Sequence, residues 1–312
     1  MDSVAAKRQI DAVLDQIETV IVGKREVIQL TLAGMLAGGH ILFEDMPGVG
    51  KTTLARALAK TLASPFQRIQ FTPDLLPSDI VGVSIFNRGT EKFEFQPGPV
   101  FTTFLLADEI NRATPRTQAA LLEAMGERRV TLDGRTHELS ADFFVMATQN
   151  PNDFEGTYPL PEAQLDRFLM RLMIGYPTFD AELSLLNRPD TQARVNALEP
   201  LLSIADVAAL KEAVKQVTIS ESLLRYMLQI ATATRTDERM RLGVSPRGVL
   251  ALESASRALA LTEGRDYVTV DDIQRLVPLV YCHRVLLHPG VRSRAEVVLG
   301  DLMRQIPAPT RG

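Results

Sequence analysis

A glycine-rich stretch between an apolar run and a helical pattern carries the clearest chemical signal in the sequence. Residues 45–53 read DMPGVGKTT and match the phosphate-binding pattern G-x-x-x-x-G-K-[ST] at every defined position except the first. Gly48 and Gly50 allow backbone N–H groups to surround an anion at the start of a helix. Lys51 would reach the β and γ phosphates, and the Thr52 hydroxyl would coordinate Mg²⁺. The pattern predicts a nucleotide-phosphate site; the simpler alternative is a glycine-rich turn with a surface lysine.

Asp45 occupies the first position of the pattern, where glycine is usual. Aspartate is one of the few residues that adopt the left-handed backbone conformation that glycine would supply there. Its carboxylate would repel the phosphates if it pointed into the loop. The sequence therefore allows a left-handed Asp45 and leaves the direction of its carboxylate open.

A second signal is an apolar run that ends in two acidic residues, FLLADE at positions 104–109. A buried strand of this kind would deliver both carboxylates to the carboxyl edge of a parallel sheet, where the glycine-rich loop also lies. There, Asp108 would hold the water shell of Mg²⁺ and Glu109 would polarise the attacking water. An isolated acidic pair at a strand end is more often solvated, but the loop favours the catalytic interpretation.

Short apolar runs that alternate with helical patterns must position these side chains. Two helical patterns precede the first apolar run, and the second of them, residues 24–37, ends at the glycine pair Gly38 and Gly39. The runs that we predict to be strands cover residues 40–44, 68–71, 103–108, 143–148 and 169–175. Their alternation with helices predicts an α/β core with a mostly parallel five-stranded sheet covered by helices.

Two further segments predict β-hairpins inserted into this core. The paired runs are residues 83–86 with 92–95, and residues 129–132 with 136–139. The second pair is joined by Asp133 and Gly134, a strong turn signal.

After Pro177 the strand patterns stop, and five helical runs follow from Ser203 onward. We therefore expect a core at residues 1–185, a linker at residues 186–202 that contains two prolines, and an all-helical domain at residues 203–312.

The composition fits an ordinary globular protein. Its 312 residues are 46% hydrophobic and 23% charged, with a formal net charge of −4. This balance disfavours non-specific nucleic-acid binding, which needs a basic surface. The single cysteine, Cys282, cannot form an internal disulfide and is expected to be buried. Because the sequence shows neither a secretory signal pattern nor a run of about 20 apolar residues, we expect a cytoplasmic protein.

The motifs together resemble the MoxR family of AAA+ ATPases. The resemblance rests on LADEINRATPRTQAALLEAM at residues 106–125, with EDMPGVGKT, FTPDLLPSDIVG, FQPGPVF, MATQNP and LPEAQLDRF, and spans nearly the whole first domain. In this family, aspartate is an accepted first residue of the loop. SPRG at residues 245–248 resembles the start of a lid helix. The resemblance implies an AAA+ P-loop core followed by a helical lid, with ATP and Mg²⁺ as cofactors.

Further site residues follow from the resemblance alone. It implies that Asn150 is sensor 1, which orients the water or contacts the γ phosphate. Arg167 would be an arginine finger for the nucleotide of a neighbouring subunit, and Arg247 would be sensor 2, reaching from the lid to the γ phosphate. Taken alone, Asn150 could be a turn residue, Arg167 could pair with a nearby acid, and Arg247 could be solvated.

The resemblance also extends the nucleotide-binding set. Val22 and Gly23 match the segment against which the adenine ring usually lies. Pro47, Val49 and Thr53 belong to the phosphate loop.

The leading functional hypothesis is a ring-forming ATPase, hexameric by resemblance, that remodels or matures partner proteins. The resemblance further implies a von Willebrand factor A domain protein as co-factor. Two alternatives are a nucleic-acid-dependent AAA+ motor, which the acidic charge disfavours, and an ATP-binding switch that scarcely hydrolyses. The remodelled substrate is not written in the sequence, because AAA+ cores share their chemistry and differ in what they grip.

Overall fold

The centre of the molecule is a five-stranded sheet with the order β2-β5-β8-β1-β9. The computed structural model describes residues 1–151, 156–187 and 190–309. The strands are β1 (Ile41–Glu44), β2 (Phe66–Gln70), β5 (Phe104–Asp108), β8 (Phe144–Gln149) and β9 (Met170–Leu172). All four neighbouring pairs are parallel. The predicted mostly parallel sheet is confirmed, with all five strands near their expected positions.

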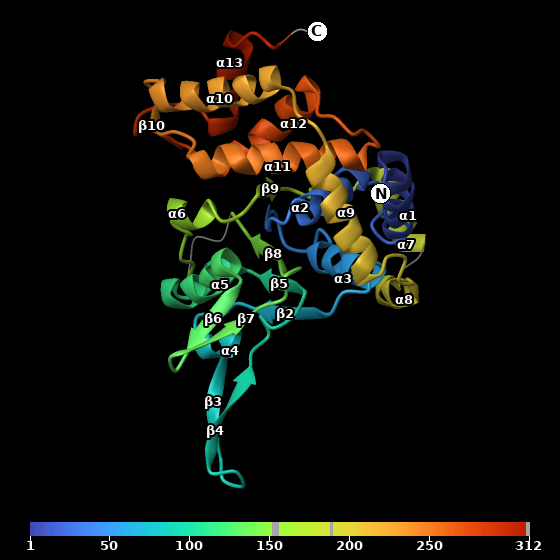
Figure 1. Ribbon diagram of the computed structural model, residues 1–312, viewed down its shortest axis with the longest axis vertical. Coiled ribbons are helices and arrows are strands. Elements are labelled where there is room, and N and C mark those ends of the chain that lie inside the picture. The colour runs from blue at the N-terminus through green and yellow to red at the C-terminus, as the bar shows by residue number, and fades with distance from the viewer. Residues whose placement is uncertain (152–155, 188–189, 310–312) are drawn as a thin grey trace.

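Helices cover both faces of the sheet (Figure 1). Successive side chains of a strand point to opposite faces, so each central strand serves two cores. Ile41 and Phe43 of β1 join the cluster formed by α1 (Ser3–Glu18), α2 (Arg25–Leu36) and α3 (Lys51–Thr61). Leu42 joins the second cluster, with α5 (Pro115–Glu127). Burial on both faces explains why these strands are continuously apolar in sequence.

Both hairpins form antiparallel pairs outside the main sheet. They consist of β3 (Gly82–Asn87) with β4 (Lys92–Pro97), and β6 (Arg129–Leu132) with β7 (Arg135–Glu138). The first projects from the end of the molecule opposite the helical region and follows the short helix α4 (Pro77–Val81) (Figure 1). Phe95 stacks on His137 with ring centroids 4.0 Å apart, which joins the two hairpins.

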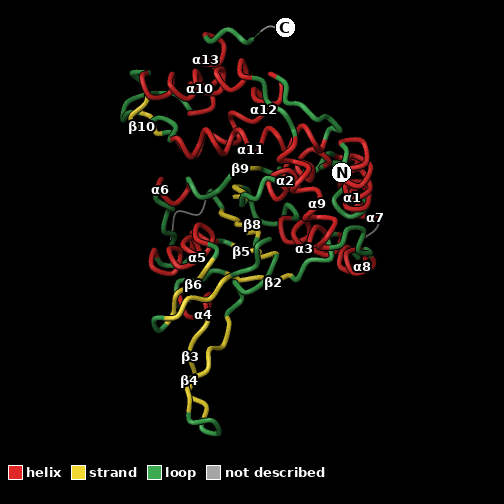
Figure 2. The backbone as a smooth tube through the Cα atoms, in the orientation of Figure 1, coloured by secondary structure: helices red, strands yellow, loops and turns green. Residues whose placement is uncertain are grey.

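The second half of the chain is mainly helical (Figure 2). After the short helix α6 (Glu162–Leu165) and strand β9, the α-helices are α7 (Phe179–Asn187), α8 (Thr191–Ala197), α9 (Ile204–Gln216), α10 (Glu221–Thr236), α11 (Pro246–Thr262), α12 (Val270–Tyr281) and α13 (Ala295–Gln305). Helix α8 lies within the segment predicted to be a linker. A short antiparallel pair, β10 (Met240–Leu242) and β11 (Leu286–Leu287), was not expected. Two or three residues are too few to produce a recognisable alternating pattern.

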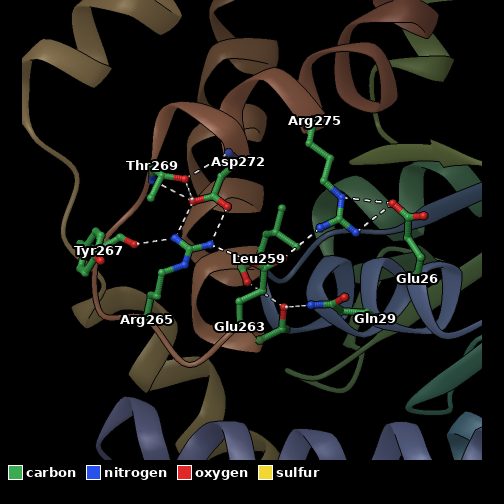
Figure 3. A network of polar contacts seen from close by, with 10 residues as sticks. Glu26, Gln29, Leu259, Glu263, Arg265, Tyr267, Thr269, Asp272 and Arg275 are labelled. Atoms are coloured by element: carbon green, nitrogen blue, oxygen red, sulfur yellow. Dashed lines mark hydrogen bonds and ion pairs between the residues drawn. The ribbon is translucent and has the colours of Figure 1, made fainter. Parts of the chain in front are cut away.

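The helical region packs directly on the core helices. One continuous hydrophobic cluster runs from α1, α2 and α3 into α9–α13. Figure 3 shows the polar contacts at this junction: Arg275 of α12 binds Glu26 of α2 and Glu263, each at 2.9 Å. Gln29 of α2 donates a 3.0 Å hydrogen bond to Thr262. These contacts fix α2, which begins just after Val22 and Gly23, against the helical region.

Among the described residues, no helix is both long enough and apolar enough to cross a membrane.

Candidate nucleotide site

The glycine-rich loop leaves β1 and enters α3, as the motif requires. Gly48 and Gly50 have φ values of 84° and 98°, a left-handed backbone that strongly favours glycine. Gly50 is the N-cap of α3 and provides no side-chain cap, so the first N–H groups of the helix remain available to an anion. The loop borders a cavity of about 270 Å³ lined by Pro47, Gly48, Gly50, Lys51, Thr52, Thr53, Asp108, Glu109, Thr148, Gln149 and Asn150.

The cavity therefore collects most of the residues predicted for phosphates, metal and water. Val49 instead packs against the hydrophobic core. Val22 and Gly23 do not line this cavity, but a Cβ at Gly50 would lie 3.8 Å from Cδ1 of the preceding residue, Ile21, so the start of their turn lies next to the loop.

Lys51 closes the loop on itself. Its Nζ donates to the carbonyl oxygens of Asp45 at 2.7 Å and Met46 at 2.9 Å. Burial lowers the pKa of Lys51, while the carboxylates of Asp45, Asp108 and Glu109 act in the opposite direction. The ammonium thus lies in a partly desolvated position, where its attraction for phosphate oxygens is strengthened.

Asp45 does not take the left-handed conformation that the sequence allows; it is not among the described residues with positive φ. Its carboxylate points away from the cavity lining and accepts three backbone N–H groups. Oδ2 accepts from Ile174 at 2.6 Å and Gly175 at 2.7 Å, and Oδ1 accepts from Met46 at 2.9 Å. The aspartate at the first position of the motif therefore places its negative charge against the segment that follows β9.

Asp108 ends β5 and is held on both carboxylate oxygens. Thr148 donates to Oδ1 at 2.6 Å, and Arg68 donates to Oδ2 at 2.8 Å and 3.2 Å. Oδ1 thus keeps one further acceptor position, whereas Oδ2 already accepts two N–H groups. Among the described residues no group of three His, Cys, Asp or Glu side chains could hold a metal alone.

Glu109 has a strained backbone at the edge of the cavity. Its φ of 56° is uncommon for a residue with a side chain, and such strain clusters at functional sites. Its N–H donates to the Thr148 hydroxyl at 2.8 Å. Its carboxylate oxygen Oε2 accepts from Gln70 at 2.9 Å and pairs with Arg112 at 3.0 Å.

Sequence reasoning missed Arg68, Gln70 and Thr148 as site residues. All three lie on strands next to β5: Arg68 and Gln70 on β2, and Thr148 on β8. Their only sequence signal is that they are polar residues at the carboxyl ends of predicted strands, and using it requires the strand order.

Arg167 and Arg247 lie elsewhere. They line a second cavity of about 380 Å³ between the core and the helical region, together with Arg128 and Arg284. Arg167 donates to the carbonyl oxygen of Leu122 at 2.8 Å. The Arg247 side chain is exposed at the start of α11. The structure thus brings the two arginines together with each other, but not with the phosphate loop of the same chain.

Arg284 is a further residue that sequence reasoning missed, and it holds the segment that carries Arg167. Its buried guanidinium donates to Asp166 Oδ1 at 2.7 Å and to the carbonyl oxygens of Phe168 at 2.6 Å and Leu169 at 3.1 Å. Burial lowers the pKa of Arg284, and the Asp166 carboxylate opposes that shift. Asp166 is therefore committed to Arg284 and not to the adjacent Arg167.

Comparison with known proteins agrees with this geometry. Residues 40–170 match the "ATPase family associated with various cellular activities (AAA)", and residues 232–301 match the AAA lid domain. The chain is 40% identical over 306 residues to "Chaperone MoxR1" of Mycobacterium tuberculosis, covering 94% of this chain and 81% of that protein. It is 32% identical to "Protein MoxR" of Paracoccus denitrificans, covering 91% and 90% of the two chains. The chain belongs to the MoxR family of AAA+ ATPases.

Two further similar proteins align with almost the whole of this MoxR-family protein. An uncharacterised Bacillus subtilis protein, YeaC, is 50% identical over 96% of this chain and 94% of its own. The crystal structure of a candidate ATPase from Cytophaga hutchinsonii superimposes with a TM-score of 0.91 at 37% identity, covering 99% of this chain and 97% of that one. Membership of this family identifies the protein as an ATPase and its nucleotide as ATP.

Proposed function

We propose that this MoxR-family protein is a Mg²⁺-dependent ATPase that assembles into a ring, hexameric by family resemblance, and remodels partner proteins. The observation that supports it is the separation of the phosphate cavity from the arginine cavity. Glu109 and Lys51 line the first, whereas Arg167 and Arg247 line the second. Within the described residues of one chain, Arg167 and Arg247 do not line the phosphate cavity, and a neighbouring copy would bring its own Arg167 and Arg247 to the transferred phosphoryl group.

The residues of the phosphate cavity divide the work. Lys51 and the N–H groups at the start of α3 would neutralise the phosphate oxygens. Thr52 and Asp108 would hold Mg²⁺, which when bound supplies electrostatic stabilisation of the phosphates. Glu109 would accept hydrogen bonds from the attacking water, and Asn150 would orient it.

The arginine cavity would act on the nucleotide of the next subunit. Arg167 lies on the core and Arg247 on the helical region, so nucleotide held by a neighbour would be touched by both parts of the chain. Arg284, which binds Asp166, would keep these parts in register. Hydrolysis would then alter the angle between core and helical region, and the two hairpins would carry that movement to a partner.

The test is steady-state ATPase activity against protein concentration, for wild type, Glu109→Gln, Arg167→Ala and an equimolar mixture of the two variants. We expect turnover per subunit to rise with concentration, to be lost in each variant, and to recover partly in the mixture. Recovery arises because an intact Arg167 from one variant faces an intact Glu109 from the other. Concentration-independent turnover with no recovery would argue for hydrolysis within one chain.

The partner proposal rests on resemblance. One relative is named a chaperone, and the family resemblance implies a von Willebrand factor A domain protein as co-factor. Such a protein should co-purify with the Glu109→Gln variant in ATP and dissociate in ADP. Equal recovery in both nucleotides, or none in either, would contradict a nucleotide-driven remodelling cycle with that partner.

A further inference from the structure

Three residues that follow β9 are held between two charged side chains. We call residues 174–176 the clamp segment. Asp45 accepts the N–H groups of Ile174 and Gly175 at 2.6 Å and 2.7 Å. Lys24 donates its Nζ to the carbonyl oxygens of Ile174 at 2.6 Å and Tyr176 at 2.8 Å. A carboxylate and an ammonium thus satisfy four of the backbone groups of this segment.

Both charged residues come from turns that border the nucleotide site. Asp45 is the first residue of the phosphate loop, and Lys24 directly follows Val22 and Gly23. The Tyr176 hydroxyl also donates to Met46 Sδ at 2.8 Å, a further contact between the clamp segment and the loop. The clamp segment therefore connects two turns that are more than 20 residues apart in sequence.

The clamp segment also leads to the helical region. Helix α7 begins at Phe179, and a Cβ at Gly23 would lie 3.9 Å from Ala181 Cβ of that helix. A movement of the clamp segment would consequently be passed to α7, and the chain continues from there to α9 and the lid helices.

The phosphate pattern itself does not account for Asp45. A glycine satisfies the loop, and the backbone of Asp45 does not use the left-handed region. Its side chain is 5% exposed, and burying a carboxylate is unfavourable unless its oxygens are hydrogen-bonded. Three N–H donors at 2.9 Å or less meet that requirement. The placement serves the connection to the clamp segment.

We propose that Asp45 and Lys24 are positioning residues that hold the clamp segment as a brace between the phosphate loop and the turn at Val22 and Gly23. Through the brace, a shift of the loop on nucleotide binding moves α7. The proposal rests on the proposed function in taking the ligand to be a nucleotide. Because separating the loop from the segment would break charge-assisted hydrogen bonds, the two move as one body.

The decisive variants are Asp45→Ala and Asp45→Gly. Asp45→Gly restores the usual first residue of the pattern, so a role confined to the loop backbone predicts normal nucleotide affinity. The brace predicts that both variants bind fluorescent ADP about tenfold more weakly, as expected when a charge-assisted hydrogen bond is lost. Asp45→Asn, which keeps one acceptor oxygen, should fall between them and wild type. Asp206→Ala is the matched control, because Asp206 accepts a backbone N–H at 2.9 Å but caps the distant helix α9.

The second readout is backbone amide exchange across residues 174–187, without and with saturating ADP. In wild type and Asp206→Ala, we expect ADP to slow exchange of the clamp segment and α7. In Asp45→Ala at saturating ADP, this response should be lost although nucleotide is bound. A normal response would overturn the proposal, as would normal affinity in Asp45→Gly.

A double-variant cycle tests whether Asp45 and Lys24 act on the same segment. Lys24→Met alone should also weaken ADP binding, and the combined change with Asp45→Ala should be clearly smaller than the product of the single effects. Fully multiplicative effects would refute a shared brace. If wild type bound no nucleotide, the proposed function would fail. The contact between Asp45 and the clamp segment could still be tested without ligand, because the Ile174 and Gly175 amides should exchange faster in Asp45→Ala than in wild type.

Discussion

His40 should make the stability of the fold depend on pH between 6.5 and 4. It precedes β1 and is 5% exposed. Its Nδ1 accepts the N–H of Val145 at 3.0 Å, and its Nε2 lies 3.3 Å from the carbonyl oxygen of Met125. A neutral ring with its proton on Nε2 satisfies both groups. Burial lowers the pKa of His40 from 6.5 to about 4, although the Met125 carbonyl opposes the shift.

The sign and size of the effect follow from linkage. The unfolded chain takes up a proton near pH 6.5, whereas the folded chain resists protonation until about pH 4. The stabilisation is thus fully present above pH 6.5 and is lost as the pH falls toward 4. At about 1.36 kcal/mol per pH unit, the loss is about 2 kcal/mol at pH 5 and about 3 kcal/mol at pH 4.

The assay compares urea unfolding of wild type and His40→Asn at pH 7.5, 6 and 5. The Asn amide oxygen can replace Nδ1 as the acceptor for Val145, and the side chain does not titrate. Other groups that titrate in both proteins cancel in the difference, including buried His283, whose pKa is also lowered by desolvation. The free energy of unfolding of wild type, relative to that of His40→Asn, should fall by about 2 kcal/mol between pH 7.5 and 5. Parallel curves for the two proteins would refute the reasoning.

Three further outcomes follow from buried or paired side chains. Burial raises the pKa of Cys282 to about 12, so a thiol reagent at pH 8 should react with the unfolded protein but not with the native one; rapid native labelling would contradict this. Gln70→Ala removes a 2.9 Å hydrogen bond that occupies an acceptor position on Glu109 Oε2, so this oxygen is more available to the attacking water and basal ATPase activity should rise about threefold; a fall would show that Gln70 orients Glu109 productively. Arg284→Met leaves Asp166 without its buried partner and should cost about 3 kcal/mol or more in urea unfolding; an unchanged midpoint would show that the pair contributes nothing to stability.

Much of the fold could be predicted because its signals are local. The central strands are short apolar runs, and the loop from Gly48 to Thr52 lies between a strand and a helix as its motif demands. The turn at Asp133 and Gly134 has φ values of 50° and 73°, as expected for the hairpin turn that the sequence signals. Each of these features depends on residues within a few positions of one another.

The placement of the other site residues depends on strand order and on which elements line each cavity. No local sequence pattern encodes either of these. Arg284 looks like any arginine after a helix, yet it binds Asp166, 118 residues earlier in the chain. The position of Arg247 relative to the phosphates depends in the same way on how α11 packs against α2. Without the fold, an arginine on the helical region could not be assigned to one cavity or the other.

Strand order and register together account for the polar pairs at the carboxyl edge of the sheet. β5 pairs with β2 so that Gln70 lies opposite Asp108, and one further step along the β5–β8 register places Asp108 opposite Thr148, its hydrogen-bond donor.

Extending the register of β1 and β9 in the same way explains the position of Asp45. β1 pairs with β9 with Phe43 opposite Leu172, so two more residues bring Asp45 opposite Ile174. Where the strands end, the Asp45 carboxylate takes over from a backbone carbonyl and accepts the N–H groups of Ile174 and Gly175. A glycine there would leave the phosphate pattern intact but end the connection between β1 and β9 at the last backbone pair. The departure from the motif is therefore a continuation of the sheet by a side chain, and it couples the phosphate loop to the segment that leads toward the helical region.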